Sequence, residues 1–421
     1  MSAQGFATLF LTFLALSLCL RLWLGLRQIR HVAAHRAAVP AEFAEKITLE
    51  EHQKAADYSI ARTRIGINNS IAETALLLAL TLAGGLHAIY NFWAQFFANG
   101  GYAHSLALFA SLAVASFLVD LPFSLYRTFR IEAQFGFNKL TPMLWLVDLV
   151  KGTALGAAIG APVILAVLWL MNAMGEHWWL YVWLFWMGFN LLVLLLYPTV
   201  IAPLFNKFSP LEDSGLKGRI EGLLTRCGFT SAGLFVMDGS KRSAHGNAYF
   251  TGFGAAKRIV FFDTLIERLT PPEVEAVLAH ELGHYKHGHI RKRIAMLAVF
   301  SLAFLWLLGQ LIAAPWFYAG LGMPYEGTAV ALILFSLALP VFTFPLGPLS
   351  SALSRKHEYE ADAYAASQTQ AGDLVTALVK LYRDNASTLT PDPLHSLYYD
   401  SHPPASARIA HLTQLRQGVP A

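Results

Sequence analysis

The sequence predicts a mainly α-helical, polytopic membrane protein with seven transmembrane helices and a polar domain that includes a small β-hairpin or sheet. Of its 421 residues, 55% are hydrophobic and only 14% are charged, and the mean hydropathy is +0.46. Apolar runs of about 20 residues, the length that crosses a bilayer, recur along the chain. The positive charges are confined to alternate connections between these runs. Together these observations exclude an ordinary soluble enzyme.

The apolar runs define the expected spans. In chain order they are roughly Gly5 to Leu26, Ser70 to Trp93, His104 to Tyr126, Thr153 to Met174, Trp178 to Val200, Ile294 to Tyr318 and Thr328 to Leu353. The first run follows MSAQG, which has no Lys or Arg, and the positive charges come after it. This arrangement favours an uncleaved anchor with its N-terminus outside over a signal peptide.

Lys and Arg give the direction of the spans. Thirty of the 31 lie in the connections after spans one, three and five and in the C-terminal tail, and the connections after spans two, four and six hold none. Positively charged connections stay in the cytoplasm. We therefore divide the chain into a five-span membrane region with cytoplasmic loops (1–200), a cytoplasmic catalytic segment (201–293), spans six and seven (294–353) and a second cytoplasmic catalytic segment (354–421).

The first polar segment contains recognisable local signals. Asp213 or Ser214 is expected to cap a helix that runs to Arg226, and LFVMDGS, HGNAYFTG and KRIVFFD have the composition of short strands, the last two forming a hairpin. Thr270 then begins a second helix, with Pro271 at its first position and Glu273 completing a capping box. We expect the two polar segments to pack into one domain over the membrane.

The second helix carries the motif HELGH. His280 and His284 are four residues apart and share one helix face, with Glu281 beside them. Two imidazoles for one ion and an adjacent carboxylate that activates water are the arrangement of zinc metallopeptidases. The alternative is a solvated, histidine-rich helix end beside the membrane.

A catalytic zinc needs a third protein ligand. Glu358 is our candidate, because it follows the last span on a second expected helix. Asp362, four residues on, can accept the free ring N–H of a ligating histidine and fix its tautomer. The alternative is an ordinary acidic helix face.

The remaining polar residues near these motifs are not expected to bind the ion. Glu360 should point away from the site and be solvated. His287, His289 and His357 should be surface residues or should support the ligands from behind.

Seven ordered segments resemble the type I CAAX prenyl proteases, seven-span zinc metalloendopeptidases of the endoplasmic reticulum membrane with bacterial relatives. The segments are EAQFGFNK, PLFNKFSPLED, DGSKRSAHGNAYFTG, KRIVFFDTL, HELGH, SRKHEYEADAYA and SHPPASARI. The resemblance implies one zinc held by His280, His284 and Glu358, with Glu281 as the catalytic carboxylate and Asp362 behind a ligand. It also implies that the spans enclose a water-filled chamber.

Two further residues are assigned less directly. His402, in the SHPP segment, is a candidate donor to the developing oxyanion, or else a turn residue before Pro403. Asn247 would bind the substrate backbone if the substrate adds a strand to the edge formed by HGNAYF, or else has a structural role. Glu73, Asp120 and Asp148 lie within or beside apolar runs and should face an aqueous interior or a partner, because a charge facing lipid costs about 2.5–3.5 kcal/mol.

The expected substrate is a peptide or protein, possibly prenylated, beside the lipid bilayer; no nucleic acid and no obligate protein partner are indicated. The alternatives are a membrane-protein quality-control metalloprotease and a non-hydrolytic zinc-binding transporter or scaffold. The tail RQGVPA has no lysine-rich retrieval signal. The chain is also rich in Ala and Arg, and its loops are compact. These features favour a bacterial inner membrane over the endoplasmic reticulum, and we expect the active site on the cytoplasmic side.

Overall fold

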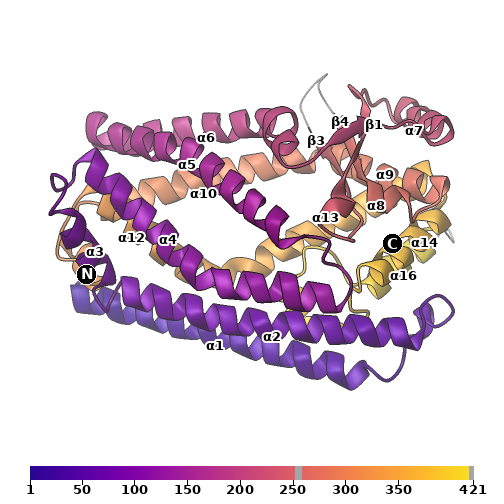
Figure 1. Ribbon diagram of the computed structural model, residues 1–421, viewed down its shortest axis with the longest axis horizontal. Coiled ribbons are helices and arrows are strands. Elements are labelled where there is room, and N and C mark those ends of the chain that lie inside the picture. Colours follow the sequence, from indigo (N-terminus) through magenta and orange to yellow (C-terminus); the bar gives the residue numbers. More distant parts are fainter. Residues whose placement is uncertain (252–257, 417–421) are drawn as a thin grey trace.

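The computed structural model describes residues 1–251 and 258–416. Ala3–His35 (α1) and Leu49–Leu80 (α2) run along one side of the molecule, and Trp178–Leu196 (α6) and His289–Leu311 (α10) run along the other. Tyr102–Tyr126 (α4) and Pro142–Ala173 (α5) slope between the two sides (Figure 1). A small sheet and a group of shorter helices lie at one end. Within the described residues, six helices are long and apolar enough to span a membrane, and a bent pair makes a seventh. The seven-span, mainly α-helical architecture is confirmed.

Most spanning helices extend well beyond their apolar runs. Their bounds are Ala3–His35 (α1), Leu49–Leu80 (α2), Gly85–Trp93 (α3), Tyr102–Tyr126 (α4), Pro142–Ala173 (α5), Trp178–Leu196 (α6), His289–Leu311 (α10), Thr328–Thr343 (α12) and Gly347–Gln368 (α13). With 33 residues, α1 measures about 50 Å at 1.5 Å per residue, whereas the hydrocarbon core is about 30 Å thick. The ends of such helices reach into the polar region.

Two spans predicted as single helices are broken. The second consists of α2 and α3, which are bent by 56° at residues 81–84, where Gly84 has a φ of +80°. The sixth ends at Leu311 and is followed by a short helix, Pro315–Gly320 (α11). Proline has no N–H to continue the preceding helix but is favourable at the first position of a new one. The continuous helices expected for Ser70 to Trp93 and Ile294 to Tyr318 were therefore wrong.

The last span leads directly into the polar domain. A short 3-10 turn, Phe344–Leu346, joins α12 to α13, and the whole stretch from Thr328 to Gln368 is 41 residues long. The predicted span ended at Leu353, where the apolar residues stop. Because the helix continues, its far end carries Glu358 out of the span and toward Pro271–Lys286 (α9), the helix that contains HELGH.

The sheet has four short strands in the order β1-β2-β4-β3. They are Phe208–Pro210 (β1), Leu234–Met237 (β2), Ala248–Thr251 (β3) and Arg258–Phe262 (β4). The predicted hairpin is present, because β3 and β4 pair antiparallel; its turn, residues 252–257, lies outside the described residues. β2 and β4 run parallel. β1 was not predicted from the sequence, and Pro210 limits it to an outer strand.

Both polar segments contribute to one hydrophobic core beside the sheet. From the first come Ser214–Arg226 (α7), Asp263–Ile266 (α8) and Pro271–Lys286 (α9); from the second, Ala371–Asp384 (α14) and Ala405–Arg416 (α16), whereas Pro393–Tyr399 (α15) contacts α13 and α1. Fully buried members include Ile220, Phe261, Val274, Ala377 and Leu412. The packing of residues far apart in sequence thus produces the single domain that we expected.

The acidic residues of the membrane region differ in their surroundings. Asp148 on α5 accepts two hydrogen bonds from Arg242, at 2.8 and 2.9 Å, and this ion pair ties the span to the polar domain. Glu73 accepts a hydrogen bond from the side-chain amide of Asn69 at 3.0 Å. Asp148 is therefore a paired charge, the structural alternative to a chamber-lining position.

Candidate active site

Helix α9 presents the HELGH motif from a well-defined start. The carboxylate of Glu273 accepts from the backbone N–H of Thr270 at 2.8 Å, the reciprocal half of a capping box, and Pro271 occupies the first turn. These contacts satisfy N–H groups that a helix otherwise leaves free at its N-terminus. They determine where α9 begins and hence which face carries His280 and His284.

The two histidines meet Glu358 of α13, and we call these three side chains the ligand triangle; one ligand atom from each lies within 4.8 Å of the other two. His280 Nε2 and His284 Nε2 are 3.3 Å apart, and each lies 3.4 Å from a different carboxylate oxygen of Glu358. A tetrahedral zinc with metal–nitrogen distances of about 2.0–2.1 Å holds its ligand atoms about 3.4 Å apart. Glu358 Oε2 is buried without a hydrogen-bond partner among the described residues. The donor set therefore fits a zinc-like ion.

Asp362 and Arg408 support this triangle from behind. Asp362 Oδ1 lies 2.8 Å from His280 Nδ1, the nitrogen that faces away from the triangle. Arg408 of α16 donates from Nε to Asp362 Oδ2 at 2.9 Å, and its Nη1 lies 3.5 Å from Glu358 Oε2. Burial opposes the charge of Arg408, but the contact with Asp362 outweighs it and raises the pKa of the guanidinium. Asp362 and Glu358 therefore share a permanent, buried counterion.

The same contacts favour a cation at the site. Burial alone would lower the pKa of His280, but the nearby carboxylates of Asp362 and Glu358 outweigh it and raise the pKa to about 9. Glu281 is next to it, and burial raises the pKa of its carboxyl group against the opposing influence of His280 and His284. A raised pKa moves a carboxylate toward the range in which it both takes and returns a proton.

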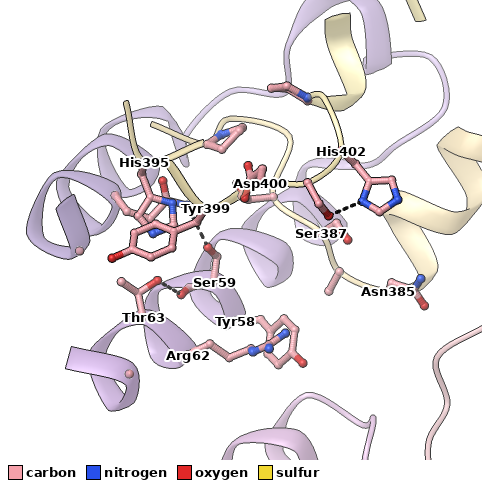
Figure 2. A pocket seen from close by; sticks show the side chains of 18 of the residues that line it. Tyr58, Ser59, Arg62, Thr63, Asn385, Ser387, His395, Tyr399, Asp400 and His402 are labelled. Atoms are coloured by element: carbon pink, nitrogen blue, oxygen red, sulfur yellow. Dashed lines mark hydrogen bonds between the residues drawn. The ribbon is translucent and has the colours of Figure 1, made fainter. Parts of the chain in front are cut away.

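His402 approaches the triangle from the loop that precedes α16. Its Nε2 lies 3.4 Å from Glu358 Oε1, and its Nδ1 lies 3.0 Å from the hydroxyl of Ser401. The side chain is 60% exposed and lines a cavity of about 640 Å³. Figure 2 shows the imidazole beside this cavity, with Tyr58 and Arg62 of α2 among the other lining residues.

Asn247 lies immediately before β3, which is at one end of the sheet order. It is exposed, and its side-chain oxygen accepts from the backbone N–H of Ala248 at 2.8 Å. Its backbone carbonyl accepts from the N–H of Phe262 at 2.9 Å. Because β3 is an outer strand and contacts α9, this edge is near the ligand helix.

Glu360 points away from the ligand triangle, as expected, but only 29% of its side chain is exposed, so the expectation that it is solvated was wrong in part. Its Oε2 lies 2.8 Å from His289 Nε2, because the start of α10 packs against this face of α13. His289 is almost fully buried, with 5% of its side chain exposed, and its Nδ1 lies 2.9 Å from His284 Nδ1. His357 is buried and stacks on His289, whereas His287 is exposed.

A second set of contacts, not predicted from the sequence, links the membrane helices to the polar domain. The Tyr58 hydroxyl on α2 donates to Glu132 at 2.7 Å. Glu132 lies 3.7 Å from His245 Nε2, and the His245 ring stacks on Phe137. Three of these residues lie in segments quoted above for the family resemblance, which was the only available signal. Arg408 was also missed, because its position within the family-like segment SHPPASARI was the only sequence signal for it.

Gly283 permits the close approach of the two ligand helices. A Cβ on this residue would lie 2.8 Å from Ala361 Cα and 3.0 Å from the Ala361 carbonyl oxygen, both backbone atoms of α13. We expect Gly283→Ala to push α9 from α13, widen the ligand triangle and lower bound metal and activity together. Gly218→Ala, at an open position on α7, is the matched control and should be neutral or stabilising by about 0.5–1 kcal/mol. Unchanged metal content in Gly283→Ala would refute this account.

Two histidines lie on one helix, a glutamate comes from the extension of a membrane span, and a second carboxylate, that of Glu281, follows the first histidine in the sequence. These are the features of an integral-membrane metallopeptidase. Comparisons with known proteins give the same class. Residues 28–207 match a family model described as CAAX prenyl protease N-terminal, five membrane helices, and residues 210–416 match peptidase family M48.

Individual relatives align over most of their length. A CAAX prenyl protease 1 homolog of Arabidopsis thaliana is 40% identical over 313 residues, covering 73% of this chain and 72% of the relative. CAAX prenyl protease 1 of Saccharomyces cerevisiae is 34% identical over 399 residues, covering 89% and 88%. The crystal structure of S. mikatae Ste24p superimposes with a TM-score of 0.90 at 34% identity, covering 97% of this chain and 99% of that one.

The chain belongs to peptidase family M48, with the five-helix N-terminal region of the CAAX prenyl proteases. The resemblance drawn from the seven sequence segments is thereby confirmed. So are the membrane fold and the peptidase class, which implies a metal cofactor and a peptide or protein substrate.

Proposed function

We propose that this protein is a zinc metalloendopeptidase that removes the C-terminal tripeptide that follows a prenylated cysteine. The observation that carries the proposal is the convergence of His280, His284 and Glu358, whose ligand atoms lie 3.3–3.4 Å from one another across the group, next to Glu281 in the sequence. The prenylated substrate class follows from the names of the relatives, which are CAAX prenyl proteases.

His280, His284 and Glu358 would hold the zinc, and Asp362 would keep the Nδ1 proton on His280 so that Nε2 faces the ion. When bound, zinc supplies a Lewis acid that polarises a carbonyl group and lowers the pKa of water. Glu358 contributes one negative charge, and Arg408 limits the charge that accumulates around it. The set leaves room for one further oxygen ligand.

Glu281 is the proposed general base. Its carboxylate takes a proton as water attacks the peptide carbonyl carbon, and later returns it to the departing amine. His402 is the proposed donor to the carbonyl oxygen. Its pKa is lowered, because partial burial and the nearby Arg408 outweigh the attraction of Glu358. This shift favours the neutral ring, which keeps one N–H to donate.

The substrate backbone is proposed to lie along β3 as an added strand. Outer strands present free backbone groups that pair with an extended peptide. Asn247, at the start of β3, would hydrogen-bond that backbone in addition. The proposed location is the cytoplasmic face of the membrane, from the distribution of Lys and Arg. The relatives named above are eukaryotic, and the bacterial inner membrane stays a prediction.

The test combines metal analysis with cleavage of a quenched, farnesylated CAAX peptide by detergent-purified protein. We expect one zinc per chain in the wild type, and much less in His284→Ala, which removes one corner of the triangle. Cleavage should require zinc and should be faster for the farnesylated peptide than for the same peptide without the lipid. Cleavage that survives complete zinc removal would contradict the mechanism, and equal rates for both peptides would contradict the substrate class.

His402→Asn should lower kcat by about 10²–10³-fold, the usual cost of losing one oxyanion donor, with little change in zinc content. The donor acts in the transition state, so KM should change much less than kcat. The measurement is steady-state kinetics on the quenched peptide. His395→Asn, in the neighbouring α15, is the control for a general effect of changing a histidine in this region. A normal kcat for His402→Asn would return His402 to its alternative role as a turn residue.

A further inference from the structure

Behind His284, on the side away from Glu358, lies a group of three residues that the proposed mechanism does not use. His289 begins α10, directly after Gly288, whose φ of +66° turns the chain back from α9. His357 and Glu360 belong to α13. The ligand nitrogens of the two histidines and a carboxylate oxygen of Glu360 all lie within 4.8 Å of one another.

The hydrogen bonds of this group form a line that leads to the ligand triangle. His284 uses Nε2 toward Glu358 and His280, so its Nδ1 faces His289 Nδ1 at 2.9 Å. His289 in turn places Nε2 at 2.8 Å from Glu360 Oε2. A carboxylate only accepts, so the proton on His289 belongs to Nε2, and its Nδ1 is then an acceptor.

The tautomer of His284 follows from these assignments. Because His289 Nδ1 accepts, His284 Nδ1 must carry the proton and donate it, which leaves the lone pair of His284 Nε2 free for a metal. A hydrogen bond to the distal nitrogen fixes both the tautomer and the orientation of a ligating imidazole. His280 receives this support directly from Asp362, at 2.8 Å. Each of the two histidines is thus connected by hydrogen bonds to a carboxylate: His280 directly to Asp362, and His284 through His289 to Glu360.

We propose that Glu360 and His289 are positioning residues for the metal site, acting as a two-step hydrogen-bond relay that holds His284 in its ligating tautomer and orientation. The proposal rests on the function proposed above, in which His284 is a zinc ligand. It gives a role to two polar side chains in a partly buried position, His289 and Glu360.

A second metal ion at His289, His357 and Glu360 is the competing interpretation of the same group. The rings of His289 and His357 are stacked, with centroids 3.9 Å apart and planes 15° apart. Lone pairs of stacked, nearly parallel rings run side by side and do not converge on one ion. Both nitrogens of His289 are also engaged in hydrogen bonds. The geometry therefore favours the relay.

The test measures zinc affinity in full-length, detergent-purified variants by competition with a chromogenic chelator. His289→Phe keeps an aromatic ring on His357 but removes both hydrogen bonds, and should weaken zinc binding about 10–100-fold, the usual cost of removing such a partner. His289→Asn restores an acceptor, because its side-chain oxygen overlays Nδ1, and should recover most of the affinity. Glu360→Gln should fall between the two. His357→Phe, which leaves the relay intact, is the control and should bind zinc normally.

A kinetic measurement separates positioning from packing. In excess zinc, His289→Phe should have the KM of the wild type but a lower kcat, because the His284 ring is less well oriented. His289→Asn should have wild-type values of both. Three outcomes would overturn the relay: wild-type zinc affinity in His289→Phe, an equal loss in His289→Asn and His289→Phe, or two zinc ions in the wild type with one lost in His357→Phe. Wild-type protein that bound no zinc would overturn the metal site itself, and the relay with it.

Discussion

Glu281→Gln is expected to abolish peptide hydrolysis while the protein keeps its fold and its metal. Glutamine has nearly the shape of glutamate but cannot take a proton, and general-base catalysis contributes typically about 10²–10⁴-fold. Glu281 is not a corner of the ligand triangle, so zinc binding should be unaffected. Cleavage of the quenched farnesylated peptide, measured beside the zinc content of the same sample, checks both halves of the prediction.

Glu267→Gln makes the same chemical change at an exposed position shortly before α9, and it should leave activity unchanged. Loss of zinc in Glu281→Gln would mean that this carboxylate contributes to metal binding. Full activity in Glu281→Gln would eliminate Glu281 as the base and leave the chemistry without a proton acceptor among the residues assigned here.

Arg408→Met should be the most destabilising single change around the site. Arg408 is buried, with 6% of its side chain exposed, and it is the shared counterion of Asp362 and Glu358. Removing one partner of a buried ion pair leaves an uncompensated charge and typically costs about 3–5 kcal/mol. The measurement is unfolding of the metal-free protein in detergent, since a bound cation would partly compensate the two carboxylates.

The matched control is Arg36→Met. Arg36 also forms a two-point contact with a carboxylate, at 2.7 and 2.8 Å from Asp57, but 41% of its side chain is exposed. Exposed pairs contribute about 0–1 kcal/mol, so this variant should unfold almost as the wild type does. Arg408→Lys should be intermediate, because lysine keeps the charge but not the planar fork. Equal stability of the two methionine variants would disprove the role assigned to burial.

The membrane architecture was predictable because its physical cause is local. A run of about 20 apolar residues is costly to expose to water, so span positions can be found without tertiary information. The start of α9 was predictable for the same reason, since Thr270, Pro271 and Glu273 satisfy the first N–H groups within one turn of the chain. The motif HELGH then places two imidazoles on one face through helix geometry alone.

The breaks in the second and sixth spans were predictable only in part. Gly84 and Pro315 are visible in the sequence, but hydropathy averages over them, and the bend of 56° depends on how α3 packs beside the other helices. β1 was missed because a three-residue strand containing proline has no periodic signal of its own. It forms because β2 offers it a partner.

The sequence by itself determined the number of spans, the helix that carries His280 and His284, and the type of chemistry that these residues support. The tertiary structure decided which polar residues stand behind them. Asp362 could be predicted from its four-residue spacing to Glu358. Arg408 could not, because it comes from α16. The contact between Glu360 and His289 forms only because α10 packs on the face of α13 that points away from the site. Contacts within one helix follow from its 3.6-residue period, whereas contacts between helices depend on how each is rotated and packed, which only the folded chain specifies.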